Sequence, residues 1–301
     1  MASNVSFTVI LLSYNHEKYV EEAICSILSQ AYLPEHLIVV DDCSQDNSVQ
    51  LIRDVLNRAV AASIKVDLIL KEQNGGVCSA INACSHLIAT DLVITAAADD
   101  VSYEGRLSVL AREWTSLGEP DAIYSNASLI NESSEQIGSF QLAYPVHSRH
   151  KALSCRNSLG LPAFYGAGSC YSSRLFRRFG PLPTDIRNED FMLMFRAWIM
   201  GGVAYSNGVL IGYRQHTSNL SINRQLALSN RLTTRCRLRY RGYFNYLLNL
   251  GYAMQSTTVL PWPTQCRVYL VLISEACKAL LRVSLVPLEE IFLHSRNRMP
   301  T

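Results

Sequence analysis

The sequence predicts an α/β protein built on a doubly wound, mostly parallel sheet. Along the first 130 residues, short apolar runs alternate with segments in which apolar residues recur at helical spacing, and this alternation is typical of βαβ units. Two of the runs, Leu37–Val40 and Leu92–Thr95, are rich in Val, Ile and Leu, as in strands buried on both faces. Each run leads to a pair of aspartates, Asp41-Asp42 and Asp99-Asp100. In open α/β sheets ligands bind beyond the carboxyl ends of the strands, where these acids are expected.

The first elements follow one another at short intervals. A strand is expected over residues 5–12, a turn over Ser13–His16, and a helix over Glu17–Gln30 because its apolar residues recur every three or four positions. After the second strand, the polar segment Ser44–Asn47 has the composition of a capped helix start. The further elements predicted here are a strand at Val66–Leu70, a turn at Asn74–Gly76, a helix from about Val77 to Ile88, the strand Leu92–Thr95, a helix at Glu104–Leu117 and a strand at Asp121–Tyr124.

This regularity decreases after Asn131. The elements expected beyond it are a glycine-broken strand at Leu161–Ser172, a helix at Glu189–Met200 and a strand at Val209–Arg214. From Asn223 onward the chain is expected to be helical, with Pro261-Trp262-Pro263 separating a helix of about 223–250 from one of about 264–286. We therefore predict an α/β domain over residues 1–220 and a basic, amphipathic helical region over residues 221–301.

Charge is distributed unevenly along the chain. The net charge is only +2, but residues 1–190 carry 14 Lys and Arg against 22 Asp and Glu, and residues 191–301 carry 13 against 3. No acidic residue occurs between Phe191 and Ser274. A basic C-terminal third favours an anionic partner, which could be a membrane surface, a pyrophosphate or nucleic acid.

Cysteine usage and hydropathy suggest a cytoplasmic protein. Nine cysteines, an odd number without a CxxC pair, are expected to be reduced and mostly buried rather than joined in disulfides. The N-terminus lacks a basic region and a long apolar stretch, so no signal peptide is predicted. We predict no transmembrane span.

The first acidic pair could serve either structure or binding. An Asp after a strand is commonly a turn former or a helix cap, and such a structural role suits Ser44 and Asp46. It does not account for two successive acids at a strand end. Tyr14 is expected on the neighbouring loop, where its ring could stack on a uracil-like base whose N3–H is accepted by the strand-end acid.

The second pair, Asp99-Asp100, is the stronger candidate for a metal site. Hard divalent cations take carboxylate oxygens and leave positions open for phosphate, so one acid could bind a ribose and the other a metal ion. Small residues, Ala96-Ala97-Ala98, precede the pair and would let a ligand approach the backbone. The alternative is that Asp99-Asp100 caps the helix that follows.

Three further groups of polar residues could contribute. Asn188-Glu189-Asp190 precedes an apolar helix, where acids are ordinarily favoured by the helix dipole, and Asp190 could be a general base if it lies opposite Asp100. Arg214 could pair with phosphate, and His216 is a candidate metal ligand, although a lone histidine is more often structural. Asn74-Gly75-Gly76 lacks the full GxGxxG pattern and is expected to shape the wall of the site.

Taken together, these residues resemble those of the family 2 glycosyltransferases with the GT-A fold. The resemblance covers roughly residues 5–220 and rests on joint order and spacing. It is carried by Ser13-Tyr14-Asn15, Val40–Asp46, Asn74-Gly75-Gly76, Ala98-Asp99-Asp100, Glu189-Asp190 and Tyr213–His216. It implies an inverting enzyme that uses a nucleotide-diphospho-sugar, most simply a UDP-sugar, and needs Mg²⁺ or Mn²⁺.

The resemblance also implies roles for individual residues. Asp42 would meet the base, Asp99 the ribose, Asp100 the metal that bridges the two phosphates, and Asp190 would be the catalytic base. The residues expected at the donor are Ser13, Tyr14, Asn15, Asp42, Asn74, Asp99, Glu189 and Arg214, with Asp100 and His216 at the metal.

The chain departs from the family pattern in two respects. Cys43 replaces the usual glycine after the first pair, and the second pair is Ala-Asp-Asp rather than a strict DxD. No QxxRW motif of polymerising synthases is present. We therefore expect transfer of a single hexosyl or N-acetylhexosaminyl group to a saccharide or glycolipid hydroxyl in cell-surface polysaccharide or lipooligosaccharide synthesis.

The C-terminal helices leave more than one interpretation open. Arginines at positions 231, 235 and 239 form a basic stripe, and the second helix is amphipathic, so the region could pack on the domain, form a homodimer or lie on the inner face of an anionic membrane. An alternative function is a nucleic-acid-binding or scaffold protein with a degenerate α/β domain, since Tyr240, Tyr243 and Phe244 lie near the arginines. We expect no nucleic-acid partner.

Overall fold

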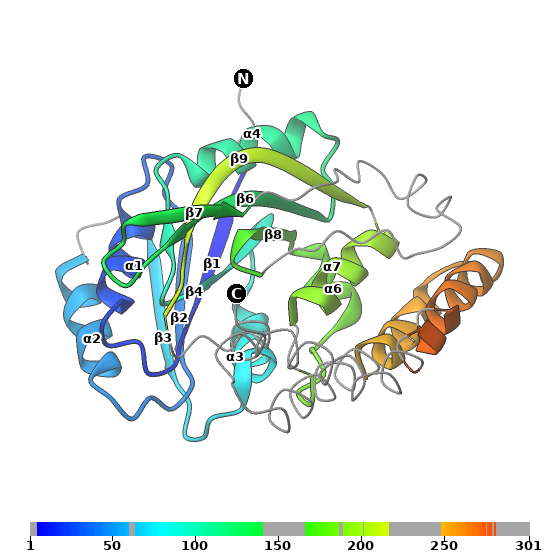
Figure 1. The fold of residues 1–301 in the computed structure, drawn as a ribbon, viewed down its shortest axis with the longest axis horizontal. Helices are drawn as coiled ribbons and strands as arrows, with labels where there is room; N and C mark the ends of the chain where they lie inside the picture. The colour runs from blue at the N-terminus through cyan, green and yellow to red at the C-terminus, as the bar shows by residue number, and fades with distance from the viewer. Residues whose placement is uncertain are drawn as a thin grey trace, which may run out of the picture. The chain divides into compact units, whose positions relative to one another are not determined.

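A computed structural model describes residues 5–59, 64–140, 166–186, 189–200, 202–216, 248–274, 276–278 and 280. The chain forms two compact units, one made of Met1–Ser154 with Gly160–Gln215 and the other of Cys155–Leu159 with His216–Thr301. The predicted boundary at residue 220 remains a prediction. In the described part of the first unit, nine strands form one sheet in the order β3-β2-β1-β4-β8-β6-β9-β5, with β7 paired to β6 (Figure 1).

The first four strands of that order are parallel and match the four predicted in the N-terminal region. They are β1 (Phe7–Ser13), β2 (His36–Asp41), β3 (Lys65–Leu70) and β4 (Leu92–Ala97). β1 lies between β2 and β4, with Ser13 opposite Asp41 and Leu12 opposite Ala97. The carboxyl ends of β1, β2 and β4 therefore meet at one edge of the sheet, which is where both acidic pairs follow.

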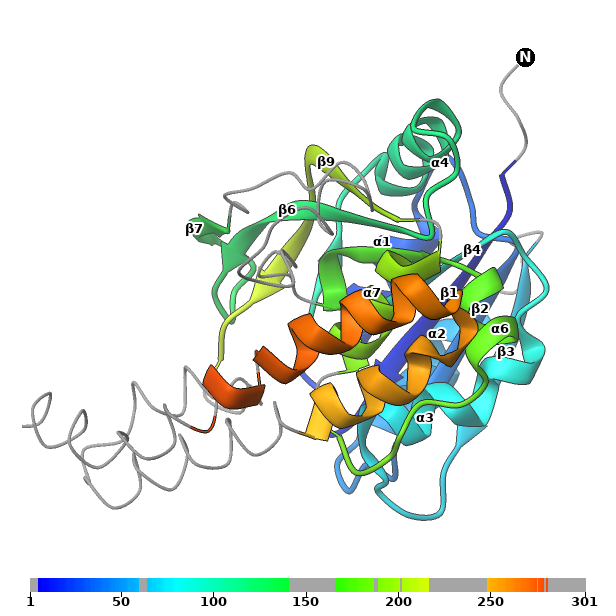
Figure 2. The same cartoon turned by 90° about the vertical axis from the view of Figure 1, so that its right-hand side faces the viewer.

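The other half of the sheet is mixed. It contains β5 (Val101–Ser102), β6 (Ala122–Ile130), β7 (Gln136–Phe140), β8 (Ser169–Ser172) and β9 (Val203–Arg214). β8 is antiparallel to both β4 and β6, whereas the long strands β6 and β9 run parallel side by side (Figure 2). The strands β6 and β9 are longer than predicted, and the short polar strands β5 and β7 were not predicted because they lack an apolar run.

The helices begin and end close to their predicted positions. They are α1 (Val20–Leu28), α2 (Ser48–Ala59), α3 (Gly76–Cys84), α4 (Arg106–Ser116), α6 (Arg174–Phe179) and α7 (Glu189–Met200), with 3₁₀ turns η1 (Ser85–Leu87), η2 (Gly166–Gly168) and η3 (Thr257–Val259). The short helix α6 was not predicted. Asp46 caps α2 as expected, because its Oδ1 accepts the Ser48 N–H at 3.0 Å.

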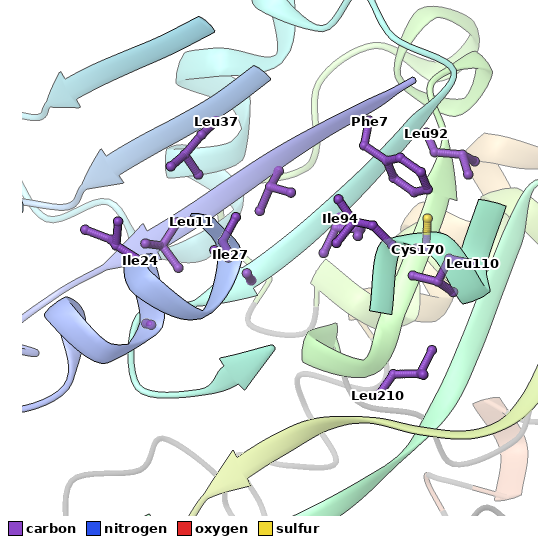
Figure 3. Packing of buried hydrophobic residues seen from close by; sticks show 14 of the residues in the cluster. Phe7, Leu11, Ile24, Ile27, Leu37, Leu92, Ile94, Leu110, Cys170 and Leu210 are labelled. Carbon is purple, nitrogen blue, oxygen red and sulfur yellow. The ribbon is translucent and has the colours of Figure 1, made fainter. Parts of the chain in front are cut away.

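Both faces of the parallel half are covered. Alternate residues of β1 point to opposite sides: Phe7, Val9 and Leu11 belong to a core with α1, α2 and α4, shown in Figure 3, whereas Ile10 belongs to a smaller core with α3. Leu37 and Ile38 of β2 divide in the same way. This two-sided burial explains the nearly continuous apolar runs in the sequence, and it fixes the strand ends that carry the acids.

In the second unit, the structure describes helical residues 248–256 and 262–274 on either side of Pro261, which agrees with the predicted break. The predicted helix 223–250, apart from its last three residues, and the arginine stripe lie outside the described residues. Within the described part of the chain, no helix is long and apolar enough to cross a membrane. Seven described cysteines are free; only Cys78, Cys84 and Cys170 of them are buried, fewer than expected.

Candidate active site

The acids of the first pair are held by donors from the protein itself. Asp41 Oδ1 accepts the Ser44 N–H at 2.8 Å, and Oδ2 accepts the Ser44 hydroxyl at 2.6 Å. Asp42 accepts the N–H groups of Gly75 and Gly76 at 3.0 and 2.7 Å and is paired with the Lys71 ammonium group. The charge of the first pair is therefore compensated before any ligand binds.

The loop after β1 is fastened to the loop after β2. The Asn15 N–H donates to Ser44 Oγ at 2.9 Å, and Asn15 Oδ1 accepts the Gln45 N–H at 2.8 Å. Asn15 has φ of 56°, a left-handed conformation that Asn tolerates better than most residues. Ser13 is buried at the end of β1, and Tyr14 is exposed. The predicted stacking residue therefore has an accessible ring on a loop fixed by hydrogen bonds.

Asp100 in the second pair has a different environment. Its Oδ1 accepts the Arg214 N–H at 2.8 Å, whereas its Oδ2 is buried and accepts no hydrogen bond from the residues that the structure describes. Burial, and then the charge of Asp99, raise the pKa of Asp100 well above its usual range. The Arg214 N–H and the charges of Arg106 and Arg214 act in the opposite direction. The carboxyl of Asp100 is therefore only partly compensated by the protein.

Arg214 reaches Asp100 because β5 pairs with β9. Val101 lies opposite Gly212, which brings the end of β9 beside the second acidic pair. The Arg214 side chain then points into the protein: Nε donates to the Asp99 carbonyl at 2.7 Å, and a second nitrogen donates to Glu22 at 2.6 Å. Its guanidinium also lies over the Tyr19 ring, 4.7 Å from the centroid.

The third guanidinium nitrogen of Arg214 donates to the 131–134 turn, at 2.9 Å from the Asn131 carbonyl and 3.0 Å from Ser134 Oγ. Only 1% of Arg214 is exposed. The prediction that this side chain pairs with donor phosphate remains a prediction. The observed contacts fasten the Asp99-Asp100 segment to β9 and to α1.

Glu189 and Asp190 begin α7. Asp190 Oδ1 accepts the Phe191 N–H at 2.7 Å, and the Gly166 N–H of η2 also bonds to this carboxylate. Burial raises the pKa of Asp190 to about 6 against these donors. Burial and then the Asp190 charge raise the pKa of Glu189 to about 8. Burial therefore disfavours a second negative charge on this pair near neutral pH.

Within the described residues, Asp190 is connected to the other acids only through intermediate residues. Glu189 and Asp190 act on the pKa of Cys78 in the first turns of α3, the helix that begins with the Gly75 and Gly76 amides bound to Asp42. In η2, the carbonyl of Ala167 accepts a hydrogen bond from the Arg106 guanidinium at 2.6 Å. Arg106 in turn acts on Asp100. The strand ends place Asp42 and Asp100 at the same edge of the sheet, and the convergence of Asp190 with them remains a prediction.

The remaining predicted residues make fewer contacts that define their role. His16 Nε2 lies 3.8 Å from Asp99 Oδ2, so Asp99 also has a neighbour from the β1 loop. Asn74 is exposed next to Gly75. His216 is buried and follows β9, but it belongs to the second compact unit. Its role as a metal ligand remains a prediction.

The acidic side chains of the site fit a divalent cation whose coordination is completed by the substrate. The described residues contain no group of three or more His, Cys, Asp or Glu that could enclose a metal. The buried Asp100 Oδ2 is nevertheless an acceptor without a hydrogen-bond donor in that part of the chain. Mg²⁺ and similar ions are commonly held by one or two carboxylates together with substrate phosphates and water, and Asp100 suits that arrangement.

Comparison with known protein families identifies the family of this chain. The model of glycosyl transferase family 2 matches residues 8–179, which contain β2–β4, all of β1 except its first residue, and both acidic pairs. The chain belongs to this family. A relative from Rickettsia typhi, described only as an uncharacterized glycosyltransferase, is 26% identical over 221 residues, covering 72% of this chain and 67% of the relative. The predicted family is confirmed.

Solved structures agree on the fold of this family 2 glycosyltransferase. The mannosyltransferase PcManGT from Pyrobaculum calidifontis, solved with GDP-Man and Mn²⁺, has a TM-score of 0.60 at 16% identity, covering 98% of this chain and 76% of that chain. S. aureus TarS 1–349, solved with UDP-GlcNAc, has a TM-score of 0.56 at 15% identity, covering 83% and 70%. The predicted GT-A fold is confirmed.

Several residues of the site were not predicted from sequence. Lys71 directly follows the predicted third strand, so its place at the ligand edge could have been inferred from that strand's end. Arg106 and Gly166 gave no comparable signal: Arg106 resembles any first-turn helix residue, and Gly166 lies in an irregular segment. A Cβ on Gly166 would lie 2.8 Å from Glu189 Oε1, so the absence of a side chain leaves room for that carboxyl.

Proposed function

We propose that this glycosyltransferase moves a single hexosyl or N-acetylhexosaminyl group from a nucleotide-diphospho-sugar to an acceptor hydroxyl, with inversion at the anomeric carbon. The observations that carry the proposal are the different states of two acids. Asp100 presents a buried oxygen without a donor among the described residues, and Asp190 is a carboxylate with a pKa near neutrality. The first suits a cation on a diphosphate, and the second suits a general base.

The nucleotide is proposed to bind at the ends of β1 and β2. A carboxylate offers about four acceptor positions, and Asp42 uses three of them for Lys71, Gly75 and Gly76. The fourth position can accept the N3–H of a uracil while the exposed Tyr14 ring stacks on the base. Asp99 is proposed to accept a ribose hydroxyl.

The diphosphate is proposed to bind beside Asp100 with Mn²⁺ or Mg²⁺. Such a cation would stabilise the negative charge that develops on the departing nucleoside diphosphate. Asp100 supplies a carboxylate oxygen that the protein does not otherwise compensate, and Arg214 fixes the orientation of that carboxylate through its backbone N–H. We expect Arg214 to act on the donor only through this positioning.

Asp190 is proposed to remove the proton from the acceptor hydroxyl. The Phe191 and Gly166 N–H groups hold the carboxylate in one orientation, and its raised pKa makes it a better base than an exposed aspartate. As the acceptor oxygen attacks the anomeric carbon, the bond to the diphosphate breaks on the opposite face, which inverts the configuration in one displacement. Burial and then the Asp190 charge raise the pKa of Glu189, which disfavours a second negative charge beside the proposed base.

The acceptor is proposed to be a saccharide or glycolipid of a cell-surface polymer. The support is the charge of the C-terminal third, 13 Lys and Arg against 3 acids over residues 191–301, which suits an anionic polymer or lipid. The solved neighbours carry both UDP- and GDP-linked donors, so the fold is compatible with either nucleotide. UDP is our proposal because the first acidic pair and Tyr14 suit a uracil.

A panel of UDP-, dTDP- and GDP-sugars, assayed for hydrolysis and transfer with Mn²⁺ and with EDTA, tests this proposal. We expect one UDP-sugar to be consumed only with the metal, and Asp190→Asn to remove that turnover. The matched control is Asp54→Asn, which changes an exposed acid of α2. Consumption of no donor, together with stabilisation of the protein by oligonucleotides but not by UDP, would favour the nucleic-acid alternative.

A further inference from the structure

The helix that begins at residue 262 carries two apolar faces. On one face Val268 and Leu272 are buried, with 1% and 0% of their surface exposed. On the other, four large apolar side chains are exposed: Trp262 by 72%, Leu270 by 70%, Ile273 by 49% and Leu280 by 56%. We call these four residues the apolar stripe; the helix is the darker of the two orange helices in Figure 2.

The apolar stripe lies on one side of the helix. Its members are separated by eight, three and seven residues, intervals that return to the same side of a helix with 3.6 residues per turn. Single exposed apolar residues are common on proteins, but a contiguous set of this kind marks a surface that meets a partner. Elsewhere in the described residues, large exposed apolar side chains such as Ile137 and Leu117 are spread over several elements.

The charge around the apolar stripe indicates the kind of partner. Arg267 is exposed and Lys278 is half-buried, and both positions lie on the helix side next to the stripe. Residues 216–301 contain 11 Lys and Arg against three acids. An apolar face bordered by basic residues is the pattern of a helix that lies in a lipid headgroup layer, where the cationic side chains reach anionic headgroups. Trp262 suits the same boundary, because its ring is both apolar and able to hydrogen-bond.

We propose that the apolar stripe attaches this protein to the surface of an anionic membrane. A second copy of the chain is a poorer partner, because a two-fold pairing through the stripe would bring two strongly basic regions together. Nucleic acid is also a poorer partner, because Leu270, Ile273 and Leu280 offer no ring on which a base can stack. The proposal goes beyond the glycosyl transfer proposed above and does not depend on the assignments of the acids.

Co-flotation of the full-length protein with vesicles tests this attachment. We expect binding to phosphatidylcholine vesicles that contain phosphatidylglycerol, weaker binding at high salt, and little binding to phosphatidylcholine alone. The double variant Leu270→Ser/Ile273→Ser should weaken binding by about tenfold or more, because two apolar side chains no longer enter the headgroup layer. The control Ile137→Ser changes an equally exposed apolar residue of β7 and should bind as the parent does.

The charge contribution is tested separately. Arg267→Glu should weaken binding to the anionic vesicles by roughly five- to thirtyfold at low salt. Its control, Arg53→Glu, reverses an exposed charge of α2 in the acidic part of the chain and should leave binding nearly unchanged. A soluble acceptor should be glycosylated equally well by parent and variants, which separates loss of attachment from loss of transfer.

Three results would overturn the proposal. The first is no binding to anionic vesicles, and the second is equal binding by the parent and the double variant. The third is a dimer without vesicles, measured by sedimentation velocity, that the double variant dissociates, because the stripe would then be an interface between two copies.

Discussion

The two acidic pairs look alike in the sequence, but their hydrogen bonding in the folded protein differs. Asp41 and Asp42 receive hydrogen bonds from Ser44, Gly75, Gly76 and Lys71, so the protein itself compensates their charge. Asp100 receives one N–H from Arg214, and its buried Oδ2 has no donor among the described residues. The first pair is therefore largely hydrogen-bonded by the protein, whereas Asp100 of the second pair keeps one buried oxygen without a donor among the described residues.

We expect the two kinds of acid to affect the stability of the fold in opposite ways. A compensated buried carboxylate stabilises the fold, because removing it leaves its donors unpaired. A carboxylate whose pKa rises on folding has the opposite effect: at neutral pH folding must either bind a proton or bury an uncompensated charge, and both cost free energy. We expect such a cost to be retained where a cation or a reacting group later uses the acid. Asp190, whose pKa is also raised, belongs with Asp100 in this respect.

The largest expected effect is on turnover. Asp190→Asn should lower kcat by about two to four orders of magnitude, because the amide cannot accept the acceptor's proton. Donor affinity should stay close to that of the parent, since Asp190 is not proposed to contact the nucleotide. Steady-state transfer with the Asp54→Asn control measures this, and normal turnover of Asp190→Asn would assign the base to another residue.

The second-largest effect is expected on binding of the nucleotide-sugar donor. Asp100→Asn should weaken donor binding in the presence of Mn²⁺ by about one to two orders of magnitude. Binding in EDTA should be nearly unchanged, because the carboxylate acts through the cation. Titration calorimetry with UDP under both conditions measures the difference, and an equal loss with and without metal would place Asp100 on the nucleotide instead.

Arg214 tests whether the second pair is positioned by β9. Arg214→Lys keeps a charge but cannot make the bonds to Asp99, Asn131 and Glu22 at once, so metal-dependent donor affinity should fall about tenfold. Glu22→Gln, which alters the exposed partner of Arg214, should have a smaller effect. If Arg214 instead touches the diphosphate, Arg214→Lys will weaken donor binding in EDTA as well.

A smaller and more gradual effect is expected from pH. Because burial raises the pKa of Asp190 to about 6, and because the base must be ionised, kcat/KM should fall about tenfold per pH unit below pH 6 and level off above it. A pH–rate profile of the parent measures this. A flat profile down to pH 5 would mean that the proton is removed by a group with an ordinary carboxyl pKa.

The sequence predicted the parallel half of the sheet well, because β1, β2 and β4 are buried on both faces and short unbroken apolar runs between turn residues are typical of such strands. It predicted the mixed half poorly. β5 has two residues, and β7 is polar on an exposed edge, so their pairing depends on partners distant in the sequence. The lengths of β6 and β9 were likewise decided by their pairing with each other.

For the site, the residue types were predictable but their electrostatic states were not. The residues at strand ends could be inferred from the alternation of strands and helices. The compensation of Asp42 by Lys71 and two glycine amides, and the inward direction of the Arg214 side chain, depend on contacts between segments far apart in the sequence. Sequence spacing alone could not show that the protein hydrogen-bonds Asp42 well but leaves one oxygen of Asp100 without a donor in the described part of the chain.

The most direct test compares the unfolding free energies of Asp42→Asn and Asp100→Asn with that of the parent, measured by urea denaturation near neutral pH without metal or nucleotide. We expect Asp42→Asn to lower the unfolding free energy by about 2 kcal/mol, because Lys71 and the two amides lose a charged acceptor. Asp100→Asn should leave the free energy unchanged or raise it. Destabilisation of similar size by both variants would contradict the account, because the protein would then compensate Asp100 as fully as Asp42.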